Sequence, residues 1–360
     1  MSAEPNFHVV LAGRPGFASP TYDHFKYAEC PFPSLDSSPD SGPQLLIKSL
    51  YISVDPALRC CMNDPSGFDY LPTWQIDETV VGLGGIGQVI SVHPDTQNVK
   101  PGDLIGVSSG FPWARFWICS GKDAISKLTK LDNPLMAAKP TLAISCLGLI
   151  GLTALIGVQE RSGVKPGAKQ TCVVSGAAGA VGSLAGQILK RLGAERVVGI
   201  AGNSQKCLTL LKEFDYDAAI CYKTTPDIRE ALAEVCPDGI DIYFDNVGGS
   251  ITDAVVCHMK PDSNVVLCGQ ISQYNKTAEY PAPLAHDAEA KRIENRITMD
   301  RFLVLNYQEK FSAALAQLSQ WVAEGRLKVK ETVVEGLENT GVAFVDMMNG
   351  KNIGKMILKV

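Results

Sequence analysis

Two glycine-rich runs have the spacing of a loop that could hold the phosphates of a nucleotide. The first, VVGLGGIGQV at residues 80–89, contains a literal G-x-G-x-x-G, and the second, VVSGAAGAVGSLAG at residues 173–186, has the looser G-x-x-G-x-x-G. Such a loop binds phosphate when it follows a strand and begins a helix, because the helix N-terminus offers free N–H groups and a positive dipole end. The segments around each run therefore decide between them.

The second run has the required context. It follows the apolar stretch TCVVS, and apolar residues then recur at spacings of three and four from Val181 to Leu192, which predicts a helix ending near Gly193. The first run is followed by QVISVHPDTQNVKPGD, which alternates and then becomes rich in turn residues. Its glycines are expected in a bent strand or at a close backbone contact. We therefore place the phosphate loop at Gly176, Gly179 and Gly182.

The end of the next strand, about twenty residues after the last glycine, selects between the nicotinamide dinucleotides. An NAD site places Asp or Glu there for the ribose hydroxyls, whereas a 2′-phosphate favours cationic or small polar groups. The chain reads GIAGNSQKC at residues 199–207, with no carboxylate. The sequence thus predicts NADP(H), with Lys206 beside the 2′-phosphate. The alternative is that Lys206 is a solvated residue in the first turn of a helix.

The pattern around these residues predicts an α/β protein with a Rossmann doubly wound parallel sheet inserted in a β-rich domain. Residues 1–135 contain short apolar runs among many Pro and Gly, which is typical of strands joined by turns. A helix is expected at 311–324, followed by strand–helix–strand. The predicted domains are 1–138, 139–308 and a return to the first domain at 309–360. The predicted parallel strands are 171–175, 196–201, 218–222, 241–245, 264–268 and 302–305.

Composition excludes several other classes of protein. The chain has 360 residues, a net charge of -5 and scattered Lys and Arg, unlike a nucleic-acid-binding protein. Its eleven cysteines contain no C-x-x-C, which favours reduced thiols, and the start lacks the features of a signal peptide. A cytoplasmic protein is expected. Residues 141–158 carry no charge, and a buried helix packed between domains is favoured over a membrane span.

These features resemble the medium-chain dehydrogenase/reductase superfamily, in which a GroES-like β domain carries an inserted Rossmann domain. Zinc-dependent alcohol dehydrogenases of that superfamily have a Gly-His-Glu segment and a four-cysteine lobe. Here VVGLGGIGQV occupies the place of Gly-His-Glu without His or Glu, and the cysteine lobe is missing. The resemblance therefore implies a zinc-free branch with no catalytic metal.

Longer phrases resemble the prostaglandin reductase branch of the superfamily over nearly the whole chain. They are SVDPALRCCMN, SGAAGAVGSLAGQI, DIYFDNVGG, LCGQISQYN, RFLVLNY, ETVVEGLENTGVAF and GKNIGKMILKV. Within the branch the similarity is greatest to the 15-oxoprostaglandin 13-reductases, the type 2 prostaglandin reductases. This implies NADPH-dependent reduction of the 13,14 double bond of 15-oxo-prostaglandins, a reaction of lipid and fatty acid metabolism.

The same resemblance implies the residues that contact NADP(H) and substrate. The glycine loop would contact the phosphates, Lys206 and Tyr222 would frame the 2′-phosphate, and Asn352 would enter from the C-terminal return. Residues 302–304 would also be core strand in any Rossmann domain. The implied NADP(H) contacts are Gly179, Ala180, Val181, Gly182, Lys206, Tyr222, Asn246, Cys268, Gly269, Gln270, Ile271, Ser272, Gln273, Tyr274, Phe302, Leu303, Val304 and Asn352. The implied substrate contacts are Ser109, Gly110, Leu303, Val304 and Leu305.

Two tyrosines are candidate catalytic residues. Reduction of an enone delivers hydride to the β-carbon and builds negative charge on the carbonyl oxygen, so a neutral hydroxyl donor near that oxygen is useful. Tyr274 would orient the nicotinamide ribose and, with a ribose hydroxyl, polarise the ketone before the enolate takes a proton from water or a hydroxyl. Tyr70 would lie nearby, or else pack in a loop. The pocket wall would be apolar, with Trp74, Phe111 and Trp113 as candidates.

One departure from the branch leaves the substrate open. Related proteins carry aromatic residues where Ser109 and Gly110 stand here, which could widen the mouth of the pocket. A broad-specificity, zinc-free quinone or alkenal reductase is therefore an alternative. A protein that binds NADPH without turnover is another. A small lipid enone is the expected partner, and the chain is expected as a monomer or homodimer.

Overall fold

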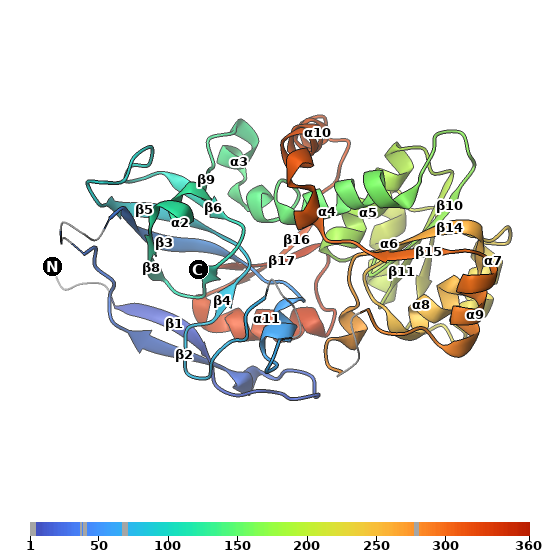
Figure 1. Ribbon diagram of the computed structural model, residues 1–360, viewed down its shortest axis with the longest axis horizontal. Coiled ribbons are helices and arrows are strands. Elements are labelled where there is room, and N and C mark those ends of the chain that lie inside the picture. Colours follow the sequence, from blue (N-terminus) through green and yellow to red (C-terminus); the bar gives the residue numbers. More distant parts are fainter. Residues whose placement is uncertain (1–4, 37, 39–41, 67–70, 277–280) are drawn as a thin grey trace. The chain divides into compact units, whose positions relative to one another are not determined.

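The computed structural model describes residues 5–36, 38, 42–66, 71–276 and 281–360. It divides into two compact units. The first comprises Met1–Ile144, Thr332–Asn352 and Met356–Val360, and the second comprises Ser145–Glu331 and Ile353–Lys355. Each unit is described separately (Figure 1).

The second unit is built on a parallel sheet of six strands in the part of the chain described. The strand order is β12-β11-β10-β13-β14-β15. The chain adds strands on one side of β10 up to β12 and then returns to add β13, β14 and β15 on the other side, as in a dinucleotide-binding fold. The three central strands β11, β10 and β13 are buried, largely apolar runs, as expected for a sheet covered on both faces. The strands are β10 (Thr171–Ser175), β11 (Arg196–Ala201), β12 (Ala218–Cys221), β13 (Ile240–Asp245), β14 (Met259–Leu267) and β15 (Thr298–Arg301).

Helices connect these strands and flank the sheet (Figure 1). Two begin at side-chain caps: Asn203 accepts a bond from the Lys206 N–H, and Asp227 accepts bonds from two N–H groups of its helix. Helix α5 ends at Arg191, and Gly193 follows with a φ of 108°. The helices are α4 (Leu149–Gly157), α5 (Ala180–Arg191), α6 (Ser204–Glu213), α7 (Ile228–Val235), α8 (Gly249–Val256), α9 (His286–Glu294) and α10 (Phe311–Ala323).

The sixth strand was predicted in the wrong place. Residues 302–305 are not a strand: β15 ends at Arg301, and a 3-10 segment, Val304–Lys310, follows. Phe302 and Val304 are buried, which explains the apolar signal, whereas β15 itself is mostly exposed and polar. The return to the first unit also differs from the expected position 309, because it begins at Thr332 and α10 packs against α4 in the second unit.

The first unit is β-rich, as predicted. Its main sheet has seven strands, with order β16-β17-β3-β5-β6-β9 and β8 paired to β3, in the described residues. Two further pairs, β1 with β2 and β4 with β7, are antiparallel. The strands are β1 (Asn6–Leu11), β2 (Phe25–Cys30), β3 (Gln44–Ser53), β4 (Val81–Gly82), β5 (Gly85–Val92), β6 (Leu104–Val107), β7 (Phe111–Pro112), β8 (Phe116–Ser120), β9 (Thr129–Lys130), β16 (Glu331–Glu335) and β17 (Lys355–Lys359). The helices are α1 (Leu58–Cys61), α2 (Lys122–Ser126), α3 (Pro134–Ala138) and α11 (Thr340–Met348).

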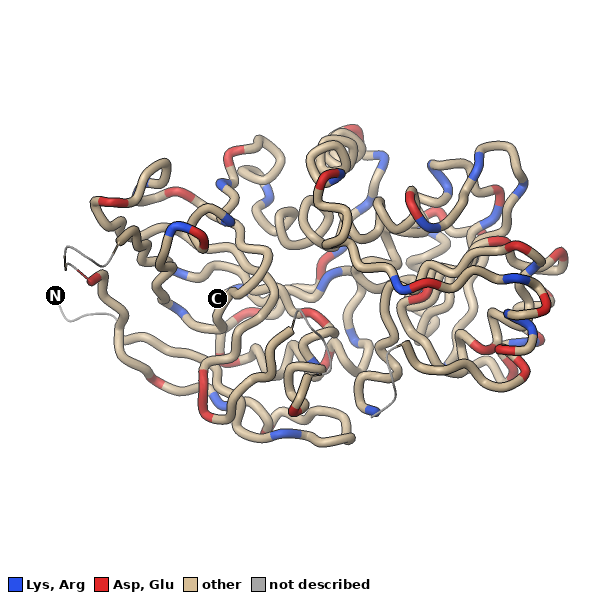
Figure 2. The backbone as a smooth tube through the Cα atoms, in the orientation of Figure 1, with Lys and Arg blue, Asp and Glu red and all other residues tan. Residues whose placement is uncertain are grey.

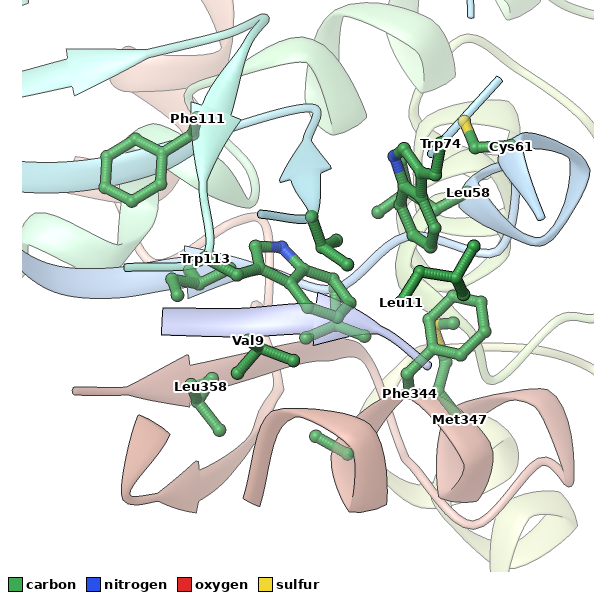
Figure 3. Close-up of a cluster of buried hydrophobic side chains, with 14 of the residues drawn as sticks. Val9, Leu11, Leu58, Cys61, Trp74, Phe111, Trp113, Phe344, Met347 and Leu358 are labelled. Carbon is green, nitrogen blue, oxygen red and sulfur yellow. The ribbon is translucent and has the colours of Figure 1, made fainter. Parts of the chain in front are cut away.

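Aromatic side chains fill the core of the first unit (Figure 3). The Trp74 and Trp113 rings meet edge to face at 5.7 Å, and Phe344 from α11 lies against both. Trp74, Phe111 and Trp113 are all buried in the core clusters or strands of this unit. They are therefore core residues rather than the pocket wall that the sequence suggested.

The uncharged stretch at residues 141–158 is broken into short elements. A 3-10 segment, Pro140–Ile144, precedes the nine-residue helix α4, and a π-helical turn, Val158–Ser162, follows it. Most of α4 is buried, in agreement with the predicted buried helix. None of the helices in the described residues has the length and apolar character that crossing a membrane requires.

Candidate functional site

The second glycine run forms a turn that leads into a helix N-terminus, as predicted. Gly176 has a φ of 56°, a conformation that favours glycine, and its carbonyl accepts the Gly179 N–H at 2.9 Å. Gly179 then precedes α5, and no side chain caps it. The first-turn N–H groups of Ala180, Val181 and Gly182 consequently have no acceptor among the described residues. They are free to bind a phosphate.

Gly182 permits close packing of the helix on this turn. A Cβ at Gly182 would lie 2.4 Å from the Gly176 carbonyl oxygen and 2.9 Å from the Ala177 Cα. A hydrogen bond of 2.7 Å from the Tyr216 hydroxyl to the Gly182 carbonyl fixes the same turn of α5 from the other side. The arrangement matches the third glycine of a dinucleotide loop, whose role is helix–strand packing.

Gly354 also contacts this loop, and sequence reasoning missed it. Its N–H donates to the Ala178 carbonyl at 2.8 Å, and Gly354 pairs with Gly179 as an isolated parallel bridge. Its φ is 69°, and a Cβ there would lie 2.0 Å from the Lys330 carbonyl oxygen. The signal was present in the phrase GKNIG, although a contact over so long a sequence separation cannot be read from one sequence.

A buried carboxylate holds the edge of the sheet beside the glycine turn. Asp245, at the end of β13, is fully buried and accepts five hydrogen bonds, which offset the cost of burying its charge. Through them it fixes the end of β10 and the turn after β13, and this role was not predicted. The donors are the hydroxyls of Ser175 (2.9 Å), Tyr243 (2.8 Å) and Thr252 (2.7 Å) and the N–H groups of Val247 (2.9 Å) and Gly248 (3.0 Å).

Lys206 lies in the first turn of α6 and is only 8% exposed, so it is not the solvated surface residue that the alternative required. Its ammonium has no hydrogen bond or ion pair with the residues that the structure describes. Burial lowers the pKa of Lys206, and the nearby positive charge of Lys223 lowers it further. A buried cation next to a second cation is unfavourable unless an anion binds between or beside them.

Tyr222 lies beside this pair of lysines. It follows β12, and its N–H donates to the Ala201 carbonyl at the end of β11. Its ring packs over Gly202, where a Cβ would lie 3.2 Å from the hydroxyl, and 41% of the residue is exposed. The structure therefore brings together Lys206 and Tyr222 at the ends of neighbouring strands, where the sequence placed the 2′-phosphate.

Asn246 and the segment 268–274 meet at the same edge of the sheet. The Asn246 side-chain amide donates to the Ser175 carbonyl at 2.8 Å, next to Gly176. The N–H groups of Cys268 and Gly269 donate to the Asp245 carbonyl, and those of Ile271 and Ser272 donate to the carbonyls of Asn246 and Val247. Gln270 is buried, and the Gln273 side chain amide lies close to Gly249. The predicted contacts in this segment thus form one interlocked loop.

The Tyr274 hydroxyl lies over Gly269. A Cβ on Gly269 would be 3.2 Å from that hydroxyl and 3.8 Å from the Asn246 carbonyl oxygen, so the absence of a side chain makes room for the phenol. Tyr274 is half-buried. Burial raises the pKa of Cys268, in the same segment, to about 12, so that its thiol stays protonated. The Tyr274 hydroxyl is a neutral donor in this loop, at the edge of the sheet.

Residues 302–305 follow β15 at the same edge of the sheet. The Phe302 N–H donates to the Leu267 carbonyl at 3.0 Å, and its ring packs with Tyr307. Phe302 and Val304 are buried, whereas Leu303 and Leu305 are half-buried. The half-buried pair is thus the part of this segment that can meet a ligand.

Three predicted site residues belong to the first unit. Ser109 and Gly110 are exposed in the turn between β6 and β7 of the first unit, and Gly110 has a φ of 81°. Asn352 is buried and also belongs to the first unit. Tyr70 lies outside the described residues. The roles of these residues and of Tyr70 remain predictions.

Charge and possible metal ligands add little to this site. Acidic and basic residues are interspersed along both units (Figure 2). Across the described ranges, no cluster of three or more His, Cys, Asp or Glu side chains is placed to hold a metal ion.

Two family profiles match the chain. The profile described as N-terminal domain of oxidoreductase matches residues 8–127, and the profile described as zinc-binding dehydrogenase matches residues 180–320. The first match falls in the first unit and the second in the unit that carries the glycine loop.

Full-length relatives agree with these profiles. A Bacillus subtilis (strain 168) protein provisionally named NADP-dependent oxidoreductase YfmJ is 40% identical over 98% of this chain and 97% of its own. Prostaglandin reductase 1 of Mus musculus is 36% identical over 94% of this chain and 95% of its own. The crystal structure of CurA in complex with NADPH from Vibrio vulnificus has a TM-score of 0.84 and 34% identity, covering 98% of this chain and 99% of that chain.

Proposed function

This chain belongs to the medium-chain dehydrogenase/reductase family and is an NADP-dependent oxidoreductase, and from that premise we propose the reaction it catalyses. It reduces the carbon–carbon double bond of α,β-unsaturated ketones, with the 13,14 double bond of 15-oxo-prostaglandins as its preferred substrate. The observation that carries the proposal is the Tyr274 hydroxyl held over Gly269 at the edge of the sheet that bears the glycine loop.

The residues present fit NADP(H). The free N–H groups at the start of α5 would hold the pyrophosphate, since nothing in the described residues caps them. Lys206, buried and without an anionic partner there, would hold the 2′-phosphate with Tyr222 at its side. NAD offers no charge to this lysine, which explains why the site would prefer the phosphorylated cofactor.

The reaction needs a hydride donor and a group that stabilises oxyanion charge. Bound NADPH supplies the hydride that the β-carbon of the enone receives. Tyr274 then donates a hydrogen bond to the carbonyl oxygen as negative charge develops there, an interaction that can contribute about 3 kcal/mol to the transition state. The proton that completes the reduction reaches the α-carbon from water or a hydroxyl group, so Tyr274 keeps its own.

The interlocked loop explains how the hydroxyl is positioned. Asp245 fixes the turn at residues 246–248, and the N–H groups of Ile271 and Ser272 bind the carbonyls of that turn. Tyr274 follows directly after this 3-10 segment, so the carboxylate positions the phenol through backbone hydrogen bonds. A rigid donor of this kind costs no reorganisation when charge develops.

The similarity to prostaglandin reductase 1 of Mus musculus supports a prostaglandin substrate, but the exposed Ser109–Gly110 turn favours a wider choice. The deciding experiment measures NADPH oxidation with 15-oxo-prostaglandin E2, trans-2-alkenals and naphthoquinones, and detects loss of the 13,14 double bond by mass spectrometry. Turnover of alkenals or quinones without 15-oxo-prostaglandin would overturn the substrate assignment. NADPH binding with no turnover of any enone would overturn the reaction.

A conservative substitution tests the role of Tyr274. Tyr274→Phe removes the hydroxyl alone, and we expect kcat/KM for the enone to fall roughly a hundredfold while NADPH still binds. Tyr27→Phe is a matched control, because Tyr27 is 40% exposed and lies on β2 in the first unit. Equal kcat/KM for the two variants would show that Tyr274 is not the donor.

A further inference from the structure

Two cysteines adjoin the residues that we assign to the 2′-phosphate. Cys207 follows Lys206 in the first turn of α6, and Cys221 precedes Tyr222 at the end of β12. Both are partly exposed, and their thiols lie near enough for each to shift the pKa of the other. The reductase chemistry uses neither of them.

The fold brings the two thiols together through the Rossmann crossover. Strands β11 and β12 are parallel, with Ala201 opposite Cys221 in the register. Helix α6 begins three residues after Ala201, and it packs against both strands. The Asn203 cap and the bond from the Tyr222 N–H to the Ala201 carbonyl fix the two chain ends. The pair is therefore part of ordered structure.

Cys221 has the surroundings of a reactive thiol. Thr224 donates its side-chain hydroxyl and its N–H to the Cys221 carbonyl, so the chain turns around the thiol, and the Thr224 hydroxyl and neighbouring backbone N–H groups lower the pKa of Cys221. Burial raises the pKa of Cys207 to about 11, so that Cys207 stays protonated. By contrast, burial raises the pKa of Cys61 to about 12. A partly exposed thiol of lowered pKa beside a second thiol is the arrangement of a redox-sensitive pair.

We propose that Cys207 and Cys221 form a dithiol that hydroperoxides oxidise to a disulfide, and that this disulfide weakens NADPH binding at the adjacent phosphate site. The Cys221 thiolate attacks the hydroperoxide: an S–O bond forms, the O–O bond breaks, and the leaving oxygen takes a proton to become an alcohol or water. The Cys207 sulfur then attacks Cys221, losing its proton. The S–S bond forms and water leaves, so that two thiols are oxidised and one hydroperoxide is reduced.

The expected loss of NADPH affinity follows from the length of the S–S bond and from the residues next to the two cysteines. A disulfide holds its two sulfurs at about 2.0 Å, closer than two unbonded thiols can approach. Closing that gap draws the first turn of α6 toward β12 and shifts the chain neighbours Lys206 and Tyr222. This part of the proposal rests on the proposed role of those two residues in binding the 2′-phosphate. NADH, which lacks that phosphate, is not expected to respond.

Mass spectrometry and cofactor titration test the two parts separately. Reduced full-length protein is treated with hydrogen peroxide, and non-reducing peptide mapping is expected to detect a Cys207–Cys221 disulfide that dithiothreitol reverses. The oxidised protein should bind NADPH about tenfold more weakly, the loss of one strong charged contact, with NADH affinity unchanged. Cys221→Ser should abolish the oxidation, and Cys207→Ser should stop it at a sulfenic acid that dimedone traps.

The controls separate failure of the dithiol from failure of the phosphate site. Cys257→Ser is the matched control, because Cys257 is partly exposed but burial raises its pKa. Oxidation of Cys257 in preference to the pair would overturn the proposal. A disulfide that leaves NADPH affinity unchanged would overturn the effect on binding. Equal NADPH affinity in reduced wild type and Lys206→Gln would instead refute the proposed 2′-phosphate site, while the mapped disulfide would still stand.

Discussion

The two glycine runs differ in what lies next to their Cα atoms. In the first run, side chains of the surrounding sheet fill that space: a Cβ on Gly85 would lie 2.5 Å from the Phe111 ring, and one on Gly82 would lie 2.7 Å from the Trp113 indole nitrogen. In the second run, a Cβ on Gly182 would meet backbone atoms of the run's own turn. Two glycine-rich runs of similar sequence therefore have different roles: the first allows core packing in its unit, and the second forms a tight turn before a helix.

The backbone conformations support this difference. Gly176 has a positive φ, which its turn requires, whereas none of the glycines at 82, 84, 85 and 87 does. The first run needs small residues, and the second needs both small residues and conformational freedom. It follows that substitutions in the two runs should affect different measurements.

The largest expected effect comes from Gly182→Ala. The added methyl group must displace backbone at Gly176 and Ala177, because its closest neighbours are not flexible side chains. Overpacking of this kind costs up to about 3 kcal/mol. If the cost falls on the turn that binds phosphate, the NADPH Kd rises roughly a hundredfold. Isothermal titration with NADPH measures this Kd. Gly13→Ala is the matched control, because a Cβ added there would have no neighbouring atom within 4 Å.

The next-largest effect is expected in the first unit, and it tests the packing role of the first glycine run. Gly85→Ala places its methyl group in the Phe111 ring, which is fully buried and cannot swing into solvent. We expect a loss of stability of about 1–3 kcal/mol, with Tm lowered about 2–4 °C for each kcal/mol. Thermal unfolding measures it, and the NADPH Kd of the folded protein should not change. A Gly85→Ala protein with normal Tm and weakened NADPH binding would reverse our assignment of the two runs.

Local pattern predicted most of the second unit. The strands at 171–175 and 196–201 have the predicted bounds, and α5 and α10 lie where periodicity placed them. The exception is β15: its sequence TMDR is polar and mostly exposed, so no apolar run marks it. The buried residues just after it produced the signal instead.

The candidate site could be predicted only in part. The glycine loop and Lys206 are local signals, because a strand, a turn and a helix follow one another along the chain. The burial of Lys206 and its closeness to Lys223 depend on how α6 packs on β12, which the sequence does not specify. The bond from Gly354 to Ala178 joins segments far apart in the chain, so it required the fold.

The smallest expected effect concerns Lys206, the buried cation in the unit that carries the second run. Lys206→Gln removes the buried cation and keeps most of the side-chain volume. We expect NADPH to bind about tenfold more weakly, since a hydrogen bond to a charged group contributes about 1.5 kcal/mol or more. NADH affinity should stay the same. Lys212→Gln is the matched control, because Lys212 lies on the same helix but is exposed.

The pH dependence of binding checks that the charge itself is responsible. Burial and Lys223 lower the pKa of Lys206, so this lysine loses its proton below its usual value of 10.5 as pH rises. The 2′-phosphate is already fully ionised above neutral pH. NADPH affinity should therefore fall with rising alkaline pH while NADH affinity stays level. Measurement in a Cys221→Ser background removes the other nearby group of lowered pKa. The same slope in Lys206→Gln would show that another group titrates, and that the buried lysine does not select the cofactor.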